Sequence, residues 1–439
     1  MTEGTGAAED AARGQPPRSL RSLLFSMELD TRMLGMVALV AIIWVGFNVM
    51  SGGLFLTARN LWNLSVQSSS IAIMATGMVL IIVSRNIDLS VGSILGLTGY
   101  VMGMAQAVWI PKSLGLGFDQ PYTWIVVLAL GLLLGAAIGG FQGFIVAYSK
   151  VPAFIVTLGG LLVWRGLIFE IAQGQTISPM DKTYALLGGG PTGSLGEWPS
   201  WILGIVACAG IAFMLITSRR RRRKYGFPVR PTWAFVTVIV LGCAAVLGLV
   251  WVTNSYHWPE ALAHQYAVSH NIAEPPGGLQ IPVGIAIPVV IMIGVTLVMT
   301  FIATRRRFGR YVFAIGGNPE AAELGGINVR WTIMLTFAVV GILAAISGAV
   351  QTARLDSAVT SLGTQAELDV IAAAVIGGTS FSGGIGTIPG AVLGAVVMQS
   401  LRSGMVLLRV DSPIQDIVVG IVLVAAVGID SFLRRRAAR

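Results

Sequence analysis

The chain has 439 residues, of which 55% are apolar and only 11% are charged, and its formal net charge is +9. Soluble domains carry about 25% charged residues, so this composition excludes a soluble globular protein and indicates a polytopic membrane protein. The basic residues gather in short stretches beside apolar runs, which favours contact with membrane lipid and argues against nucleic acid as a partner.

A polar leader, 1–32, precedes the first apolar run. Four of its apolar residues have helical spacing beside Arg18 and Arg21, and this predicts a short helix on the inner membrane surface. The four are Leu20, Leu23, Leu24 and Met27. We expect 33–433 to form one transmembrane domain and 434–439 to form a basic cytoplasmic tail.

Apolar runs long enough to cross a membrane follow one another along the chain. A helix needs about 20 apolar residues to cross the hydrocarbon core. On that measure we predict an all-α transmembrane bundle of about twelve spans, within a range of ten to twelve. The expected spans are 33–52, 61–83, 89–110, 123–147, 153–172, 200–217, 232–252, 281–303, 331–350, 366–381, 385–408 and 414–433. Glycines crowd 366–381 and 385–408, which leaves open whether the first crosses or is a half-helix that turns back.

The distribution of the 29 Lys and Arg residues predicts the orientation of these spans. With the N-terminus inside and twelve crossings, 21 of them lie on the inner face, 5 on the outer face and 3 within or at the edges of spans. This asymmetry predicts cytoplasmic N- and C-termini and an even number of crossings. It places the loop 253–280 outside and the loop 304–330 in the cytoplasm.

Three features that resemble binding sites have simpler explanations. The outer loop holds His257, His264 and His270 without ligand spacing, so we expect no metal and no cofactor. Cys208 and Cys243 lie inside apolar runs and are expected to act as small hydrophobic residues. The basic run 219–224 directly follows a span, which is typical of an anchor on anionic lipid.

Glycines recur every three or four positions in three of the expected spans. Such spacing lets helix backbones approach closely, which membrane helices need because apolar contact alone gives no preference over lipid. We therefore expect close packing at Gly92, Gly96, Gly99 and Gly103, at Gly131, Gly135, Gly139 and Gly143, and at Gly386, Gly390 and Gly394.

The cytoplasmic loop contains a short helix with clear start and stop signals. Asn318 can cap it, Pro319 suits its first position, and Gly325 and Gly326 end it. A helix of about two turns is not stable alone in water, so it must pack on something. A cytosolic partner is the expected support, and the alternative is an ordinary loop helix lying on the membrane surface.

Two segments interrupt the apolar pattern, one in each half of the chain. The first is SRNIDLSVGS at 84–93, where Asp88 or Ser90 can cap the following helix. The second is GGTSFSGGIG at 377–386, shortly after Glu367 and Asp369. Interrupted helices in corresponding halves point to a transport pathway. The candidate pathway residues are Asn86, Asp88, Ser90, Asn63, Gln67, Glu367, Asp369, Thr379 and Ser380.

The chain lacks the motifs of an enzyme. It has no G-x-x-x-x-G-K-[ST] phosphate-binding loop, no G-x-S-x-G elbow and no H-E-x-x-H pair, and we predict no catalytic residue. If nucleotide hydrolysis drives transport, the ATPase is a separate chain.

Four motifs in order carry a resemblance to a known family. NIDLSVGS, KVPAFIVTLGG, RRRFGRYVFAIGGNPEAAELGGINV and ELDVIAAAVIGGTSFSGGIGTIPGAVLGA resemble the membrane permeases of bacterial monosaccharide ABC importers, the ribose/xylose/galactoside group. The similarity runs from about residue 54 to 430. An extra apolar pair, 200–252, makes the chain most similar to the D-xylose permeases of that group.

The resemblance implies a permease subunit that moves a neutral monosaccharide, D-xylose, across the bacterial inner membrane. It implies a homodimer, two cytosolic ATP-binding subunits and a periplasmic sugar-binding protein. It also implies an ATPase-coupling helix made of Asn318, Pro319, Glu320, Ala321, Ala322, Glu323, Leu324, Gly325 and Gly326. The alternative is an ion-coupled secondary transporter that uses Asp88, Glu170 or Asp369 as its proton or cation site. The chain departs from the family in its long leader, its basic run and its enlarged 253–280 loop.

Overall fold

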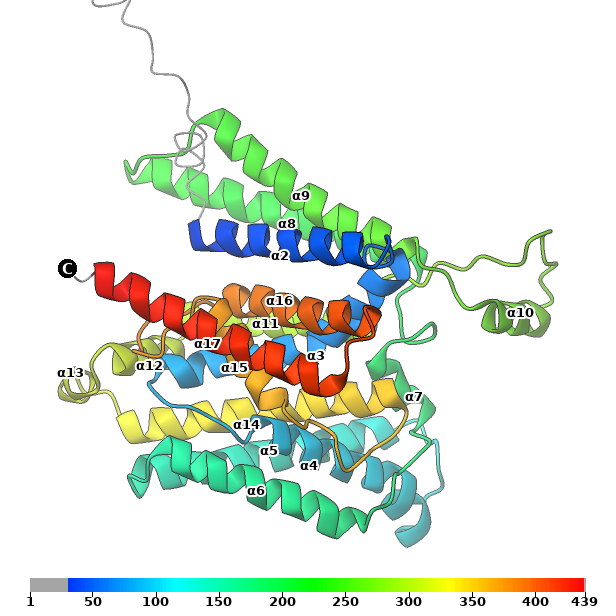
Figure 1. Ribbon diagram of the computed structural model, residues 1–439, viewed down its shortest axis with the longest axis horizontal. Helices are drawn as coiled ribbons and strands as arrows, with labels where there is room; N and C mark the ends of the chain where they lie inside the picture. The colour runs from blue at the N-terminus through cyan, green and yellow to red at the C-terminus, as the bar shows by residue number, and fades with distance from the viewer. Residues whose placement is uncertain (1–30, 438–439) are drawn as a thin grey trace, which may run out of the picture. The chain divides into compact units, whose positions relative to one another are not determined.

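Helices are the regular elements of the computed structural model, which describes residues 31–437 and contains isolated β-bridges but no strand there (Figure 1). The expected surface helix of the leader and residues 438–439 lie outside the described residues. The α-helices are α2 (Thr31–Met50), α3 (Ala58–Val83), α4 (Val91–Met104), α5 (Thr123–Tyr148), α6 (Ala153–Ala172), α7 (Lys182–Ala185), α8 (Glu197–Lys224), α9 (Thr232–Asn254), α10 (Glu260–Ser269), α11 (Ile287–Arg305), α12 (Arg307–Gly317), α13 (Pro319–Leu324), α14 (Val329–Leu355), α15 (Ala366–Ile376), α16 (Ile388–Leu407) and α17 (Ser412–Ala437). A π-helix, η2 (Ala105–Ser113), continues α4, and a 3₁₀ turn, η3 (Leu186–Gly188), follows α7.

Ten of these helices are long and apolar enough to cross a membrane, which confirms the predicted polytopic bundle within its expected range. The expected span 366–381 is not a complete one. Its helix α15 has 11 residues, and at 1.5 Å per residue it covers about 16 Å of a hydrocarbon core that is about 30 Å thick. It is therefore a half-helix. The expected span 414–433 lies in α17, whose apolar described part is Ser412–Ala425.

The start of the expected span 281–303 is wrong by six residues, because α11 begins at Ile287. The preceding residues are extended and form bridges from Pro282 to His257 and from Gly284 to Gly196. Pro282 donates no backbone hydrogen bond, and Gly284 has a φ of +77°, so a helix does not form there.

The chain forms two compact units. The first contains Trp201–Leu249 and the described residues up to Leu34, and in it the free thiols of Cys208 and Cys243 each lie near the other's carbonyl oxygen, at 3.8 and 4.0 Å. The second unit contains Gly35–Ser200 and the described residues from Val250 onward. All sites described below lie within this second unit.

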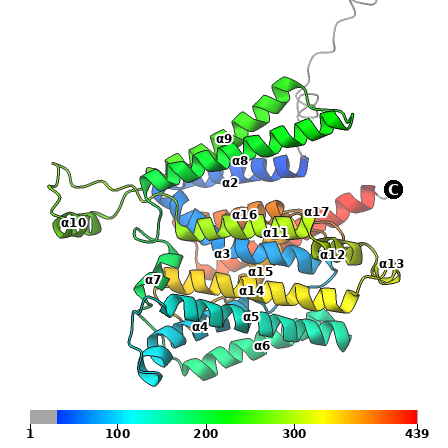
Figure 2. The ribbon, with the colours of Figure 1, turned by 180° about the vertical axis from the view of Figure 1, so that it is seen from behind.

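Two sets of four consecutive helices in the second unit, α3 to α6 and α14 to α17, run in opposite directions. α3 ends beside the 377–387 loop, whereas α14 ends beside Ile177, at the other end of the helices (Figures 1 and 2). In each set an irregular stretch follows the first helix and leads into a short one, α4 or α15. The third helix of each set packs on the first helix of the other set: α5 lies on α14, and α16 lies on α3. Inverted repeats of this kind are typical of transporters, whose binding sites lie between the repeats.

The glycine repeats mark the closest contacts, as predicted. Gly135 lies on Gly341, and Gly139 lies on the backbone of Phe337 and Ala338, so α5 and α14 touch through their backbones. Gly394 lies on Ala373 in the same way, between α16 and α15. The repeat in α4 faces a different partner, mainly the irregular stretch 357–365 that precedes α15.

We expect Gly139→Ala to lower the stability of the protein, whereas the neighbouring change Gly140→Ala should not lower it, since alanine favours a helix where space allows. A Cβ at Gly139 would meet the Phe337 carbonyl oxygen and lie 3.1 Å from Ala338 Cα, whereas at Gly140 the nearest atom is Ala338 Cβ at 3.8 Å. Overpacking costs about 1–3 kcal/mol. Thermal unfolding in detergent measures both variants, and equal unfolding temperatures would contradict the backbone contact.

Candidate functional site

The N-terminal ends of α4 and α15 meet in the interior of the second unit. Gly92, in the first turn of α4, lies so close to Gly363 and to the side chain of Glu367 that a Cβ would not fit. The N-terminus of a helix carries a partial positive charge. Two such ends face each other here, and each has a carboxylate nearby, Asp88 for α4 and Glu367 for α15.

Asp88 orders the chain just before α4. It is 1% exposed, and its Oδ1 accepts hydrogen bonds from Ser90 N at 2.8 Å and from Ser90 Oγ at 2.6 Å. Gln142 Oε1, on α5, lies 2.9 Å from the same hydroxyl. Asp88 therefore holds the turn that starts α4, and Ser90, although it is the N-cap residue, makes no side-chain capping bond itself.

We expect Asp88→Ala to abolish transport and Asp88→Asn to retain much of it. Alanine leaves Ser90 N without its acceptor and weakens the start of α4, at a cost of about 0.5–2 kcal/mol, whereas asparagine keeps an acceptor oxygen in the same place. Uptake into vesicles measures the effect. Wild-type uptake by the alanine variant would show that this turn is not needed.

Glu367 is the second residue of α15. It is 9% exposed, and its Oε2 has no hydrogen-bond partner among the described residues. Arg165, on α6, instead donates to the carbonyl oxygens of Leu362, at 2.7 Å, and Thr360, at 3.3 Å. Arg165 thus satisfies backbone groups that the interrupted helix leaves without partners.

A cavity of about 380 Å³ opens between α3, α14, α15 and α16. Most of its polar groups are amides and hydroxyls, and its charged residues are Asp369, Arg402 and Arg354. Its lining consists of Gln67, Ile71, Gln351, Arg354, Leu355, Val359, Ser361, Leu362, Gly363, Thr364, Ala366, Asp369, Gln399 and Arg402. This volume lies in the range of small-molecule sites.

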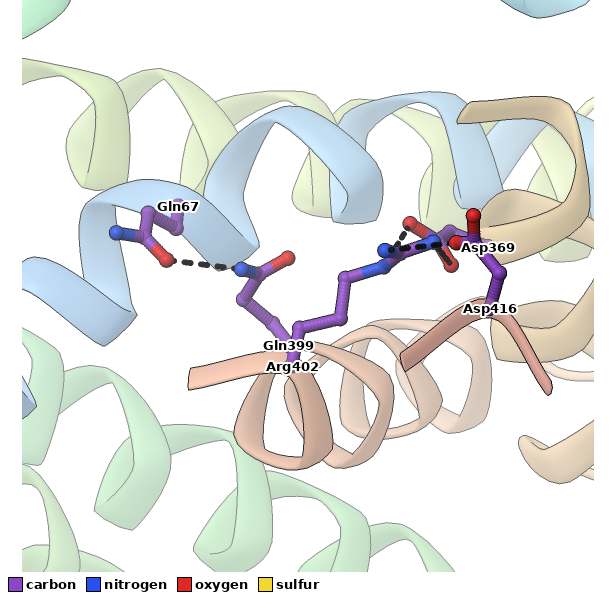
Figure 3. A network of polar contacts seen from close by, with 5 residues as sticks. All are labelled: Gln67, Asp369, Gln399, Arg402 and Asp416. Atoms are coloured by element: carbon purple, nitrogen blue, oxygen red, sulfur yellow. Dashed lines mark hydrogen bonds and ion pairs between the residues drawn. The ribbon is translucent and has the colours of Figure 1, made fainter. Parts of the chain in front are cut away.

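Polar contacts fix the positions of the side chains along one wall of this cavity (Figure 3). Gln399 Nε2 donates to Gln67 Oε1 at 2.8 Å and so joins α16 to α3. Arg402 forms an ion pair with Asp369, with distances of 2.8 and 3.0 Å, and its Nη1 lies 3.7 Å from Asp416 of α17. Arg402 and Asp369 neutralise each other, so this wall presents mainly neutral hydrogen-bonding groups.

The structure brings only two of the nine pathway candidates, Gln67 and Asp369, to the cavity lining. Glu367, Asp88 and Ser90 lie where the N-terminal ends of α4 and α15 meet. Asn63 is half-buried and lies one turn before Gln67, outside the lining, and Asn86 bonds to Ser84. Thr379 and Ser380 are buried in the loop that follows α15.

Six polar residues of the lining were not among the sequence candidates. They are Gln351, Arg354, Ser361, Thr364, Gln399 and Arg402. Gln399 and Arg402 are polar residues inside an expected span, which is the signal that identified Gln67. Gln351 lies one residue beyond the predicted end of its span, which in fact continues to Leu355.

The capped helix of the 304–330 loop is present as predicted. It is α13, in which Asn318 Oδ1 accepts from Ala321 N at 3.1 Å, proline occupies the first turn, and Gly326 has a φ of +82°. Its last residue, Leu324, is 90% exposed. The loop also holds α12, which the sequence reasoning missed although Val312 and Ile315 have the spacing of a buried helix face.

Ten apolar helices, two inverted sets with interrupted members and a polar cavity between them define a membrane transport permease. The chain belongs to the family described as branched-chain amino acid transport system / permease component, whose model matches residues 60–185 and 183–427.

Sequence comparison places specific transport permeases among its relatives. The chain is 39% identical to the xylose transport system permease protein XylH of Escherichia coli (strain K12) over 411 residues, which cover 93% of this chain and 94% of the relative. It is 37% identical to the protein of that name in Haemophilus influenzae over 91% of this chain and 96% of the relative. It is 33% identical to the ribose import permease protein RbsC of Escherichia coli (strain K12) over 86% of this chain and 87% of the relative. No solved structure matches the chain.

Proposed function

We propose that this chain is the permease subunit of an ATP-binding-cassette importer that moves a neutral monosaccharide, D-xylose, across the inner membrane. The observation that carries this proposal is the cavity between α3, α14, α15 and α16. Its amide and hydroxyl groups both donate and accept, as the hydroxyl groups of a sugar require. The likeness to xylose and ribose permeases supports the same class of solute.

The charges of the site favour a neutral solute over a coupled ion. Asp369 has Arg402 as its counter-ion, and Asp88 already accepts two hydrogen bonds. Glu170 lies exposed on α6, away from the cavity lining. The three carboxylates named for a proton- or cation-coupled transporter, Asp88, Glu170 and Asp369, are therefore occupied as an acceptor, outside the cavity and paired, respectively.

The two ends of the second unit support the proposed partners. α13, with its exposed Leu324, is suited to a cleft in a separate ATP-binding subunit, and a homodimer would present two such helices to two ATPases. The loop that carries α10 lies at the other end (Figure 1), where a periplasmic sugar-binding protein would dock. In this assembly both termini of the chain are cytoplasmic.

Uptake of labelled sugar into proteoliposomes that contain the permease, its ATPase and its binding protein tests the proposal. We expect uptake of D-xylose that requires ATP, survives a protonophore and exceeds uptake of D-ribose. Uptake without ATP that a protonophore abolishes would instead establish the secondary transporter. A preference for ribose would overturn the choice of sugar and leave the transport class intact.

A further inference from the structure

Three segments that are far apart in the sequence meet where α3 ends. They are residues 83–86, the last turn of α12, and the 377–387 loop between α15 and α16. Gly384 N donates to Val83 O at 3.0 Å, which joins the 377–387 loop to α3. Gly316 leaves no space for a Cβ against Val83 O and Gly384 N, so all three backbones are in contact.

Arg85 connects α3 to α12 at this point. Its Nε donates to Gly316 O and its Nη2 to Gly317 O, both at 2.7 Å. The last carbonyl groups of a helix have no partner within it and carry partial negative charge, so a guanidinium is a strong ligand for them. The backbone of Arg85 has a φ of +64°, a conformation that is uncommon for a residue other than glycine.

The third segment is held by hydrogen bonds within itself and also touches Arg85. Within the 377–387 loop, Ser380 N donates to Ile385 O at 2.9 Å and Gly383 N donates to Ser380 O at 3.0 Å. The Ser380 and Ser382 hydroxyls are 2.6 Å apart. Gly383 lies against Arg85 Cγ, so the loop packs on the side chain that holds α12. Ser380, a pathway candidate, thus belongs to this junction.

The chain leaves the junction in three directions. Gly317 leads through Asn318 directly into α13, 86–90 leads through Asp88 into α4, and the 377–387 loop joins α15 to α16. We propose that Arg85 is a positioning residue for energy coupling: its guanidinium fastens the base of α13 to the segments that adjoin α4 and α15, so that movement of α13 moves them together. This inference rests on the proposed function, in which α13 receives movement from the ATPase.

The simplest competing role for Arg85 is local, as a cap of α12. Both roles predict some loss of stability when Arg85 is removed, but only coupling predicts that ATP hydrolysis continues while sugar movement falls. The exposed surface of α13 remains unchanged in such a variant, so binding to the ATPase is retained. Arg310 provides a matched control, because it is an exposed arginine on α12 whose hydrogen bond goes to Arg305 O, within the 304–330 loop.

The test compares wild type, Arg85→Ala, Arg85→Lys and Arg310→Ala in proteoliposomes that hold the complete transporter. Pull-down measures association with the ATPase, and parallel assays measure ATP hydrolysed and sugar transported. For Arg85→Ala we expect wild-type association and a rise of about tenfold or more in ATP hydrolysed per sugar, because two charge-assisted hydrogen bonds are lost. Arg85→Lys should give an intermediate ratio, since an ammonium group lacks the fork that reaches both carbonyl groups.

A wild-type ratio in Arg85→Ala, or an equal rise in Arg310→Ala, would overturn the coupling role. If Arg85→Ala does not accumulate in the membrane, Arg85→Lys tests the coupling role in its place. A wild-type ratio of ATP hydrolysed to sugar transported in Arg85→Lys would then overturn that role. Failure of the wild-type permease to bind any ATPase would overturn the proposed function instead, which pull-down detects separately.

Discussion

Replacing Leu324 with glutamate is expected to abolish association with the ATPase subunit and to leave the membrane helices folded. Leu324 is 90% exposed at the end of α13, so no contact within the chain is lost. In a complex its side chain would be buried, which is worth about 1.5–3 kcal/mol for leucine, and a glutamate there would add the cost of an unpaired charge. Pull-down of the ATPase from detergent measures the loss.

Two further variants make this result specific to α13. Leu324→Met keeps an apolar side chain of similar volume and should bind the ATPase as wild type does. Deletion of 318–326 should abolish association completely while insertion into the membrane continues. If the glutamate variant or the deletion variant still binds the ATPase normally, α13 is a surface helix of the loop and has no coupling role.

Substitution of one partner of the ion pair between Asp369 and Arg402 is expected to lower stability more than the other changes described. The two side chains are only 9% and 21% exposed, and removal of one partner of a buried pair costs about 3–5 kcal/mol because the other charge remains uncompensated. Arg402→Gln should therefore lower the unfolding temperature strongly, since it leaves Asp369 without its counter-ion. Asp369→Asn should lower it less, because Arg402 keeps Asp416 at 3.7 Å.

The double variant Asp369→Asn with Arg402→Gln should recover much of the lost stability, because two neutral amides replace the two charges and can bond to each other. A thermal-unfolding cycle of wild type, the two single variants and the double variant measures the coupling. Losses that simply add would show that the two side chains act independently. Sugar uptake by the double variant then separates a structural role from direct contact with the solute.

Much of the fold could be predicted because spans and caps are local properties. Ten apolar runs became helices of spanning length, since composition over about 20 residues decides whether a segment enters the hydrocarbon core. α13 was predicted for the same reason, because Asn318 and Pro319 act within one turn. The orientation of the termini stays a prediction from the Lys and Arg distribution.

The cavity was predicted less well because its lining depends on which sides of distant helices face one another. Gln67 meets Gln399 across 332 positions of sequence, and no local pattern indicates that pairing. The sequence predicts that 357–365 belongs to a loop between two spans. In the structure this stretch packs against the glycines of α4, which are small enough for its backbone to come close. The junction at Arg85 likewise joins residues 231 positions apart.

The sequence alone therefore determined that the protein crosses the membrane many times and carries a short capped helix between two spans, since both follow from composition and caps within a few turns. Only the tertiary structure decided that α4 and α15 start in the interior and face each other, and that Arg85 joins α3 to the base of α13. The physical reason is that these features depend on close backbone contacts between distant segments, which glycine permits but does not by itself specify.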